Sequence, residues 1–380
     1  MTNNRLKEII ERPGSWTSAY VDGDGPRPRV EEESRERSVG DRLLEIGAPA
    51  EDADAIAQAL GERRGVASPS ARIVLASAGE VVLDESFSGA RRGPERLVQG
   101  PLPLIVPLLR HESDDARYLV VEASRDSADI RLETATRGTS SRTQIEGDSD
   151  DITKVQAGGW SHANFQRYAE STWKRNQAEV AETVREIVRE SRPVFVAVAG
   201  DVRARQLLIE ELGDLEHTPI VEADAHTHAD GADSAKLDDA IASALEDHAR
   251  DRIQRIRDGA LADNGSAGAE GIPAVVAALQ QARVEAVVLD NRMLDADEEL
   301  LALDAAPWVA SDESEMLDAN LICRTSAAEA LARAAVLTDA EVVIEEEPAS
   351  AEDAPREERP VREPLASLRW PDPDDATEGA

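Results

Sequence analysis

The most constraining feature of this sequence is a long amphipathic stretch at residues 163–192, in which apolar side chains recur at spacings of three, four or seven. The stripe consists of Phe165, Ala169, Trp173, Val180, Val184 and Ile187. This spacing follows the period of an α-helix and predicts a rod with one apolar face. Pro193 stops the pattern, and the apolar run VFVAVA begins directly after it. A long helix joined directly to a strand predicts an α/β fold.

The first 113 residues are predicted to form an N-terminal α/β domain. WTSAYV at 16–21 is typical of a strand, and helical patterns follow at 29–46 and 51–62. Residues 72–87 contain two apolar runs separated by Ala-Gly, which predicts a hairpin.

Residues 114–262 are predicted to form a middle domain that contains the long helix. ARYLVVEASRDSADIRLE indicates two strands, and the polar stretch 137–159 is predicted to be loop because it has no hydrophobic period. After VFVAVA, a helix is predicted at 202–212 with Asp201 as its N-cap, and another at 237–260.

Residues 263–370 are predicted to form a C-terminal α/β sandwich domain with helices on both faces, closed by the returning strand PLASLRW. Residues 345–364 contain eight acidic residues and four prolines, and we expect them to be mobile. Residues 371–380 are expected to be a disordered tail.

The charge balance is extreme, with 77 acidic and 42 basic residues and a formal net charge of −35. Only four basic residues are lysine, and aromatic residues make up 3% of the chain. These features together predict a halophilic protein from an acidic proteome. At about 1 M salt the Debye length is only about 3 Å, so local patches and not net charge would decide which partners bind.

No segment has the apolar length of a signal peptide or a membrane span, so we expect a cytoplasmic protein without a membrane partner. The single cysteine, Cys323, lies in the apolar run NLICR and is predicted to be a buried, inert thiol in a strand. We expect a monomer.

Motifs for cofactors and for ordinary hydrolases are absent from the sequence. GDVRARQLL has one glycine where a dinucleotide fingerprint needs three, so we predict a tight strand-to-helix turn and no cofactor. His226 and His228, among aspartates, could share a metal if they lay on a strand, but no second cluster completes a shell. We therefore expect no metal, and a stress-related enzyme is the weakest alternative.

Residues 152–178 form a locally basic segment, with Lys154, Arg167, Lys174 and Arg175 against a single Glu170. Trp160 and Phe165 add flat aromatic faces on which bases could stack. RNA binding is the favoured interpretation. The alternative is that the aromatic side chains cap the domain core and that the basic side chains pair along the helix.

The stretch GGWSHANFQR, followed by VAVAGDVRARQLL, resembles the archaeal and eukaryotic class-I release factor and Pelota superfamily, and most closely its bacterial and archaeal release-factor-like branch. That branch includes Balon-type ribosome hibernation factors and Vms-like peptidyl-tRNA hydrolase relatives. The resemblance implies a three-domain release-factor/Pelota-like architecture. It also implies a C-terminal domain like that of kink-turn-binding ribosomal proteins, a similarity seen in GIPAVVAALQQARVEAVVLD.

The resemblance further implies binding in the ribosomal A site, with the middle domain reaching towards the peptidyl-transferase centre. The partners would be ribosomal RNA, peptidyl-tRNA and a translational GTPase. The expected contact loop consists of Gly158, Gly159, Trp160, Ser161, His162, Phe165, Gln166, Arg167, Lys154, Lys174 and Arg175.

Release factors place a glutamine directly after the two glycines, where this chain has Trp160. A non-hydrolytic factor of hibernation or rescue is therefore favoured. The alternative is a peptidyl-tRNA hydrolase of ribosome quality control, in which His162 would be the catalytic residue that orients water.

Overall fold

The computed structural model describes residues 3–23, 29–66, 68–112, 115–146, 159–215, 217–225, 234–262, 266–346 and 361–370. Within these ranges, side chains at the N-terminal ends of three helices (3, 29–34, 36 and 159–169) and at 138–139 are outside the description. The chain divides into two compact units, one formed by residues 1–113 and 250–380 and the other by residues 114–249. The three-domain division expected from the sequence stays a prediction.

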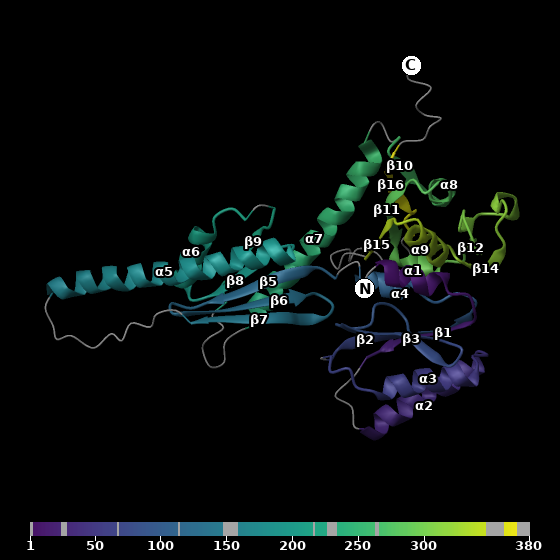
Figure 1. Ribbon diagram of the computed structural model, residues 1–380, viewed down its shortest axis with the longest axis horizontal. Helices are drawn as coiled ribbons and strands as arrows, with labels where there is room; N and C mark the ends of the chain where they lie inside the picture. The colour runs from purple at the N-terminus through teal and green to yellow at the C-terminus, as the bar shows by residue number, and fades with distance from the viewer. Residues whose placement is uncertain are drawn as a thin grey trace, which may run out of the picture. The chain divides into compact units, whose positions relative to one another are not determined.

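The first sheet of the larger unit is antiparallel, with the strand order β3-β2-β1-β4 (Figure 1). Its strands are β1 (Trp16–Asp22), β2 (Ser70–Ser77), β3 (Glu80–Ser88) and β4 (Arg96–Gly100). Helices α2 (Arg29–Glu45) and α3 (Ala50–Gly61) pack on one face. The predicted hairpin is confirmed, because Ala78 and Gly79 both adopt positive φ angles, as a tight two-residue turn requires.

The second sheet of this unit has the order β10-β16-β11-β15, with β11 and β15 parallel. Its strands are β10 (Gly268–Glu270), β11 (Val284–Asp290), β15 (Glu341–Glu345) and β16 (Leu365–Leu368). Helices α8 (Ile272–Gln280) and α9 (Ala327–Leu337) cover one face, and the end of α7 (Ala235–Leu261) covers the other. The predicted sandwich and its returning strand are confirmed.

One hydrophobic core joins these two sheets within the larger unit. It contains the remaining face of the first sheet, α1 (Asn3–Glu11), α4 (Val106–Glu112), α8 and α9. The carboxylate of Glu329 on α9 accepts hydrogen bonds from the backbone N–H groups of Ile105 and Val106, at 3.1 and 3.0 Å. The N-terminus of α4 is thus bound by a side chain more than 200 positions away in the sequence.

A short third sheet has the order β13-β12-β14. It consists of β12 (Glu299–Leu303), β13 (Val309–Ala310) and β14 (Leu321–Ser326), flanked by the 3₁₀ turns η2 (Asn291–Asp295) and η3 (Glu313–Glu315). Cys323 lies in β14, as predicted, but its side chain is only partly buried. The expectation of a buried thiol was wrong because β14 is an edge strand. Its partial burial still raises the pKa of the thiol.

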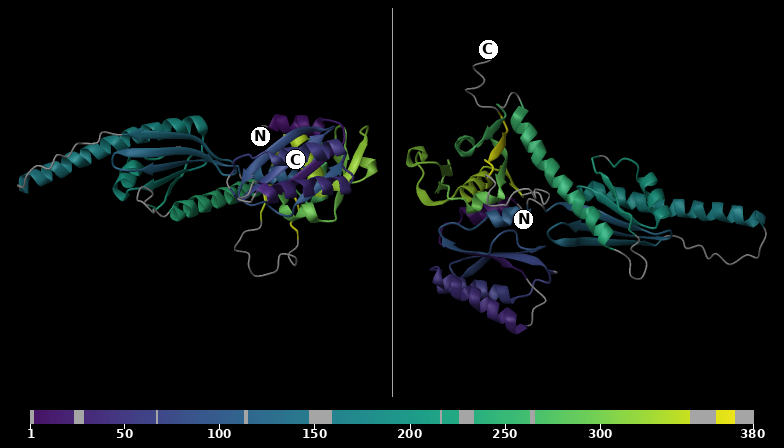
Figure 2. Two further views of the ribbon diagram at one scale, coloured as in Figure 1. Left: turned by 90° about the horizontal axis from the view of Figure 1, so that it is seen from below. Right: turned by 180° about the vertical axis from the view of Figure 1, so that it is seen from behind.

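The smaller unit is built on a five-stranded sheet of order β7-β6-β5-β8-β9, in which β5, β8 and β9 are parallel. The strands are β5 (Arg117–Ala123), β6 (Ser127–Thr134), β7 (Gly138–Glu146), β8 (Val196–Gly200) and β9 (Ile220–Glu222). Helices α5 (Gly159–Ser191) and α6 (Val202–Leu212) pack on one face, and the start of α7 packs on the other. In two views, the N-terminal half of α5 runs past the strands (Figures 1 and 2).

Strand β7 corrects the prediction that residues 137–159 are entirely loop. It pairs antiparallel with β6 from Gly138 to Glu146, at the edge of the sheet. Its described side chains are mostly exposed, so the hydrophobic alternation that marks a half-buried strand is missing. The expected mobile segment 345–364 and the tail 371–380 lie mostly or wholly outside the described residues.

Candidate nucleic-acid interface

Helix α5 begins at Gly159, four residues before the predicted start at Ala163. Trp160, Ser161 and His162 therefore belong to its first turn and not to a preceding loop. After Gly159 the helix contains neither proline nor glycine, so no residue in it opposes the early start. The predicted RNA contacts from Gly159 to His162 thus lie at the N-terminal end of a helix.

Three more predicted contact residues, Phe165, Gln166 and Arg167, follow in the next turn of α5. Their side chains, like those of Trp160, Ser161 and His162, are outside the description, and Lys154 and Gly158 lie outside the described residues altogether. The roles of these residues in RNA binding, and that of His162 in catalysis, stay predictions.

The remaining predicted contacts, Lys174 and Arg175, are exposed on α5. The Nζ atom of Lys174 lies 3.5 Å from the Glu211 carboxylate on α6, and Arg203 on α6 forms an ion pair with Glu170 on α5. Exposed ion pairs contribute about 0–1 kcal/mol each. These cations could therefore exchange a carboxylate for a phosphate at little cost.

Two buried amides attach α5 to the turn between β5 and β6. Gln177 is fully buried, and its Nε2 donates to the Ser124 carbonyl at 2.8 Å. One residue earlier, Asn176 is 5% exposed, and its Nδ2 donates to the Arg125 carbonyl at 3.3 Å. Backbone carbonyls of the turn are thus satisfied by the helix, which fixes where the N-terminal half of α5 leaves the sheet.

The side chain of Arg125 connects this turn to both helices of the same face. Its guanidinium carbon lies 4.8 Å from the centre of the Trp173 ring on α5, within cation–π distance. The same guanidinium lies 3.3 Å from the carboxylate of Asp201. Arg125 is about half exposed, so a cationic group and an aromatic ring share the surface at the base of α5.

Asp201 caps α6, as the sequence predicts. Its carboxylate accepts hydrogen bonds from the N–H groups of Arg203 and Ala204 at 3.0 and 3.2 Å. Partial burial would raise the pKa of Asp201, but the Ala204 hydrogen bond and the charge of Arg125 outweigh it and hold that pKa below its usual value.

The preceding Gly200 explains the tight turn. Its φ is +113°, and a Cβ atom there would lie 2.0 Å from the Ala123 carbonyl oxygen. The single glycine therefore allows β8 and β5 to approach each other closely, which supports the interpretation of GDVRARQLL as a structural turn.

Sequence reasoning missed Arg125, Asn176 and Gln177. A signal was present, because the apolar stripe of α5 skips a position between Trp173 and Val180 where Asn176 and Gln177 stand. Two amides on an otherwise apolar helix face indicate a polar surface opposite them. That surface is a turn about 50 residues earlier in the sequence, and the hydrophobic period of the helix does not identify it.

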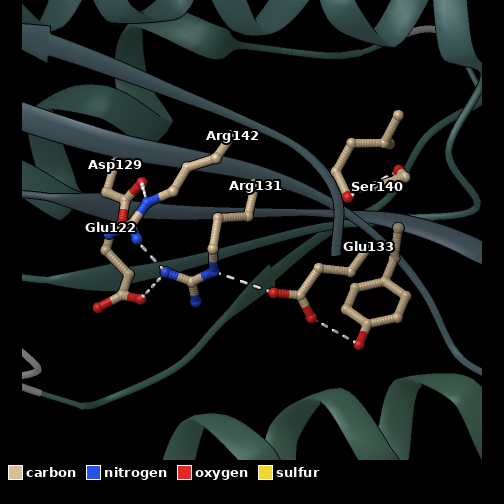
Figure 3. Close-up of polar contacts among 8 residues, drawn as sticks. Glu122, Asp129, Arg131, Glu133, Ser140 and Arg142 are labelled. Carbon is tan, nitrogen blue, oxygen red and sulfur yellow. Dashed lines mark hydrogen bonds and ion pairs between the residues drawn. The ribbon is translucent and has the colours of Figure 1, made fainter. Parts of the chain in front are cut away.

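The other face of the sheet carries a charged network on β5, β6 and β7 (Figure 3). Arg131 forms ion pairs with Glu122, Asp129 and Glu133, and Arg142 donates to Asp129 at 2.6 and 2.9 Å. Partial burial favours a raised pKa for Asp129, but the hydrogen bonds and charge of Arg142 outweigh it and hold that pKa low. Because each of these carboxylates has a cationic partner, the network suits a structural role.

Metal ligation has no support among the described residues, where no group of three His, Cys, Asp or Glu side chains could hold an ion. His226 and His228 lie outside those residues. In the described part of the chain, no helix has both the length and the apolar content needed to cross a membrane.

Comparisons with known proteins give this geometry a family context. Residues 117–266 match the family model "Bacterial archaeo-eukaryotic release factor family 2", and this range includes the whole five-stranded sheet with α5 and α6. The chain is 23% identical to an uncharacterized protein of Mycobacterium tuberculosis, Rv2629, over 76% of this chain and 78% of that one.

Similar solved structures include the archaeal translation termination factor aRF1, at 15% identity, covering 97% of this chain and 99% of that one with a TM-score of 0.23. They also include archaeal Pelota in a model of its ribosome-bound form with ABCE1, at 14% identity, 97% and 93% coverage and a TM-score of 0.33. The predicted resemblance to archaeo-eukaryotic release factors is confirmed for residues 117–266, the part of the chain that the family model matches.

Proposed function

We propose that this chain, whose residues 117–266 match a release-factor family model, is a ribosome-binding translation factor that occupies the A site in hibernation or rescue without cutting peptidyl-tRNA. One observation carries the proposal: the family match contains a 33-residue helix that starts at the second of two glycines and runs past its own sheet (Figure 1). This geometry suits a probe that reaches into a confined RNA site.

The attachment of α5 supports such a role. At about 1.5 Å per residue the helix is about 50 Å long. The buried amides Asn176 and Gln177 fix its position on the sheet, and the N-terminal part of the helix runs past the ends of the strands (Figure 2). A rod attached in this way can present its first turn at a distance without bending.

The residue after Gly158-Gly159 favours occupation over hydrolysis. Release factors use a glutamine there to help water attack the ester, and this chain has Trp160. An indole cannot accept a hydrogen bond from water, because its Nε1–H is a donor only. It can stack on a base, and truncating such a contact costs about 1–3 kcal/mol.

The direct test is co-sedimentation of the full chain with ribosomes from resting cells in molar salt. We expect the protein in the large-subunit or whole-ribosome fraction, and Trp160→Ala to weaken that binding about tenfold. Trp370→Ala is the matched control, because Trp370 is 48% exposed in the larger unit and its loss should leave binding unchanged. Absence of the parent protein from every ribosomal fraction would refute the proposal.

The second candidate is a peptidyl-tRNA hydrolase, which His162 in the first turn of α5 favours. It predicts release of labelled peptide from stalled peptidyl-tRNA and loss of that release in His162→Ala. Release that survives this change would exclude His162 as the catalytic residue. No release by the parent protein, with intact ribosome binding, would favour the non-hydrolytic factor.

A further inference from the structure

The third sheet of the larger unit carries a leucine that neither packing nor backbone geometry explains. Figure 1 shows β12 and β14 of this sheet at the right of the larger unit. Leu317 lies between η3 and β14, and its side chain is 81% exposed. Its φ is +52°, in the left-handed region that is unfavourable for a residue with a Cβ atom and that glycine adopts freely. Leu321, four residues later at the start of β14, is 41% exposed.

Trp308, next to the same sheet, shows how an unfavourable backbone angle is normally offset. Its φ is +71°, but its side chain packs against the main core of the larger unit, and its carbonyl accepts the Leu303 N–H at 3.0 Å. In the turn that holds Leu317, the residues that pack on the sheet are Met316 and Ala319. Leu317 therefore gains little from the fold, which points to a contact outside the chain.

Hydrogen bonds fix the turn from which Leu317 projects. The Ala319 N–H donates to the Met316 carbonyl at 3.1 Å. The backbone N–H and the Nδ2 of Asn320 donate to the Asp304 carboxylate at 2.8 and 2.9 Å. Because the turn is already ordered, a partner that contacts Leu317 would not bear the entropic cost of fixing it.

The surroundings of Leu317 are more acidic than the rest of the chain. Residues 293–323 contain nine acidic residues and no lysine, arginine or histidine, a net charge of −9. At the average composition of the chain, a segment of this length would carry about −3. All nine acidic residues are described, and Asp295, which pairs with Arg96, is the one that has an ion pair within the described part of the chain.

Two of these carboxylates are held in the ionised form by their neighbours. Hydrogen bonds from the side chain and backbone of Asn320 hold the pKa of Asp304 below its usual value. Hydrogen bonds from Ser314 lower the pKa of Asp312 in the same way. The surface around Leu317 is therefore negative throughout the neutral pH range.

We propose that Leu317 and Leu321 are the apolar anchors of a docking surface for a basic amphipathic segment of a partner protein. Such a segment presents lysine or arginine side chains next to apolar ones, so it matches both the leucines and the uncompensated carboxylates. The same charge repels RNA phosphates, anionic lipids and a second copy of this chain, whose net charge is −35. The inference does not rest on A-site binding.

The structure favours docking through side chains over the addition of a strand to β14. A β-bulge interrupts this edge strand, where Ala302 pairs with Cys323 and Leu303 pairs with Leu321. Bulges twist an edge strand away from pairing with another chain. Metal binding does not explain the acidic residues either, because no group of three potential ligands is arranged to hold an ion in the described part of the chain.

Fluorescence anisotropy of the full chain with a labelled amphipathic peptide of leucine and lysine tests the proposal. Hydrogen exchange locates the bound peptide. We expect binding that protects residues 311–323, weaker binding of the same peptide in scrambled order, and no binding when glutamate replaces lysine. Failure of the first peptide to bind would overturn the proposal. Protection of 311–323 by an RNA decamer, or by higher protein concentration alone, would overturn it as well, because either result assigns the surface to another occupant.

A leucine variant tests the apolar anchor. Leu317→Ser should raise the Kd for the peptide about tenfold, because burial of a leucine side chain is lost. Its urea midpoint should match that of the parent, since the side chain is exposed. Leu261→Ser is the matched control, because Leu261 is 71% exposed on α7 in the same unit and its Kd should equal that of the parent. Equal Kd values for the two variants would overturn the assignment.

A charge variant tests the complementarity. Glu313→Gln combined with Asp318→Asn removes two exposed carboxylates beside Leu317 and should raise the Kd several-fold, with a smaller effect at high salt. Glu51→Gln combined with Asp54→Asn removes the same charge from exposed positions on α3 and is the matched control. Equal effects of the two pairs would show that the peptide responds to net charge alone, and the proposal would be wrong.

Discussion

Helices α9 and α5 follow the same hydrophobic period but have opposite surroundings. All eleven residues of α9 are buried, and many of them are alanines. In α5 the described buried residues form a single stripe on the sheet side, while its N-terminal half extends past the strands (Figure 2). The comparison shows that α9 packs against the core along its whole length, whereas the described part of α5 packs on its sheet along one face only.

The polar groups of the two helices differ in the same way. On α9, the Arg333 guanidinium donates to the Leu303 carbonyl at 2.9 Å, and burial lowers its pKa to about 10. On α5, Lys174 pairs with an exposed carboxylate at 3.5 Å. Buried charges on α9 are bound to backbone groups and are costly to remove, while charges on α5 can change partners.

The largest effect should come from removing core volume under α9. Leu331 is fully buried, so Leu331→Ala should lower the free energy of unfolding by about 2–5 kcal/mol. The exposed Ser171 on α5 is the matched position, and Ser171→Ala should change it by no more than about 0.5 kcal/mol. Urea titration measures the free energy of unfolding of both variants. Similar losses in the two would contradict the difference between α9 and α5.

The next effect concerns pH and the carboxyl group of Glu329. Burial raises its pKa to about 7, against the lowering by the N–H groups of Val106 and Ile105. The folded state therefore keeps a proton between about pH 4.5 and 7 that the unfolded state releases, so stability should fall by about 3 kcal/mol as the pH rises through this window.

Glu329→Gln should remove this slope, which urea midpoints at pH 5 and pH 8 would show. Asp84 does not mimic the effect: although its burial raises the pKa, hydrogen bonds from Arg72 and Arg64 lower it on balance. Its contribution is lost only as the pH falls below about 4. An unchanged slope in Glu329→Gln would contradict the assignment.

A smaller effect is expected at the anchor of α5. Gln177→Ala leaves the partly buried Ser124 carbonyl without its donor and should cost about 1–3 kcal/mol. Glu179→Ala, on an exposed position two residues later, is the control. Hydrogen exchange of the β5–β6 turn should accelerate only in the Gln177 variant if the amide anchors the helix.

The smallest effect belongs to the exposed pair of Lys174 and Glu211. Lys174→Ala should change stability by about 0–1 kcal/mol and less at high salt. The same variant should weaken ribosome binding measurably, because a phosphate contact is lost. A stability loss above about 2 kcal/mol, with binding unchanged, would assign Lys174 to the fold instead.

Elements with a strong period were predictable from the sequence. The strand at 16–22, the hairpin at 70–88, helices α3 and α6 and the Asp201 cap occur where the pattern places them. Elements whose hydrophobic pattern is weak, or whose packing depends on distant segments, were missed. The sequence analysis did not predict α1 and α4, whose apolar residues pack on a core that distant segments complete. It predicted β7 as loop because an edge strand with exposed side chains needs no alternation.

Only the local features of the candidate interface were predictable from the sequence. The glycine pair, the aromatic residues and the local positive charge are visible in the sequence, since they lie within 25 residues of one another. The sequence does not indicate the roles of Arg125, Asn176 and Gln177, because these roles depend on contacts that the fold creates.

The sequence by itself determined the helices and strands that have a strong hydrophobic period, and which residue follows the glycines, because periodicity, turn chemistry and residue identity are local properties. Only the tertiary structure decided which strands pair, such as β5 with β8 and β11 with β15. It also decided that Glu329 binds the start of α4 and that Met316 and Ala319 pack on the third sheet while Leu317 stays exposed. Those arrangements depend on burying apolar surface from distant parts of the chain, and no local pattern specifies which parts will meet.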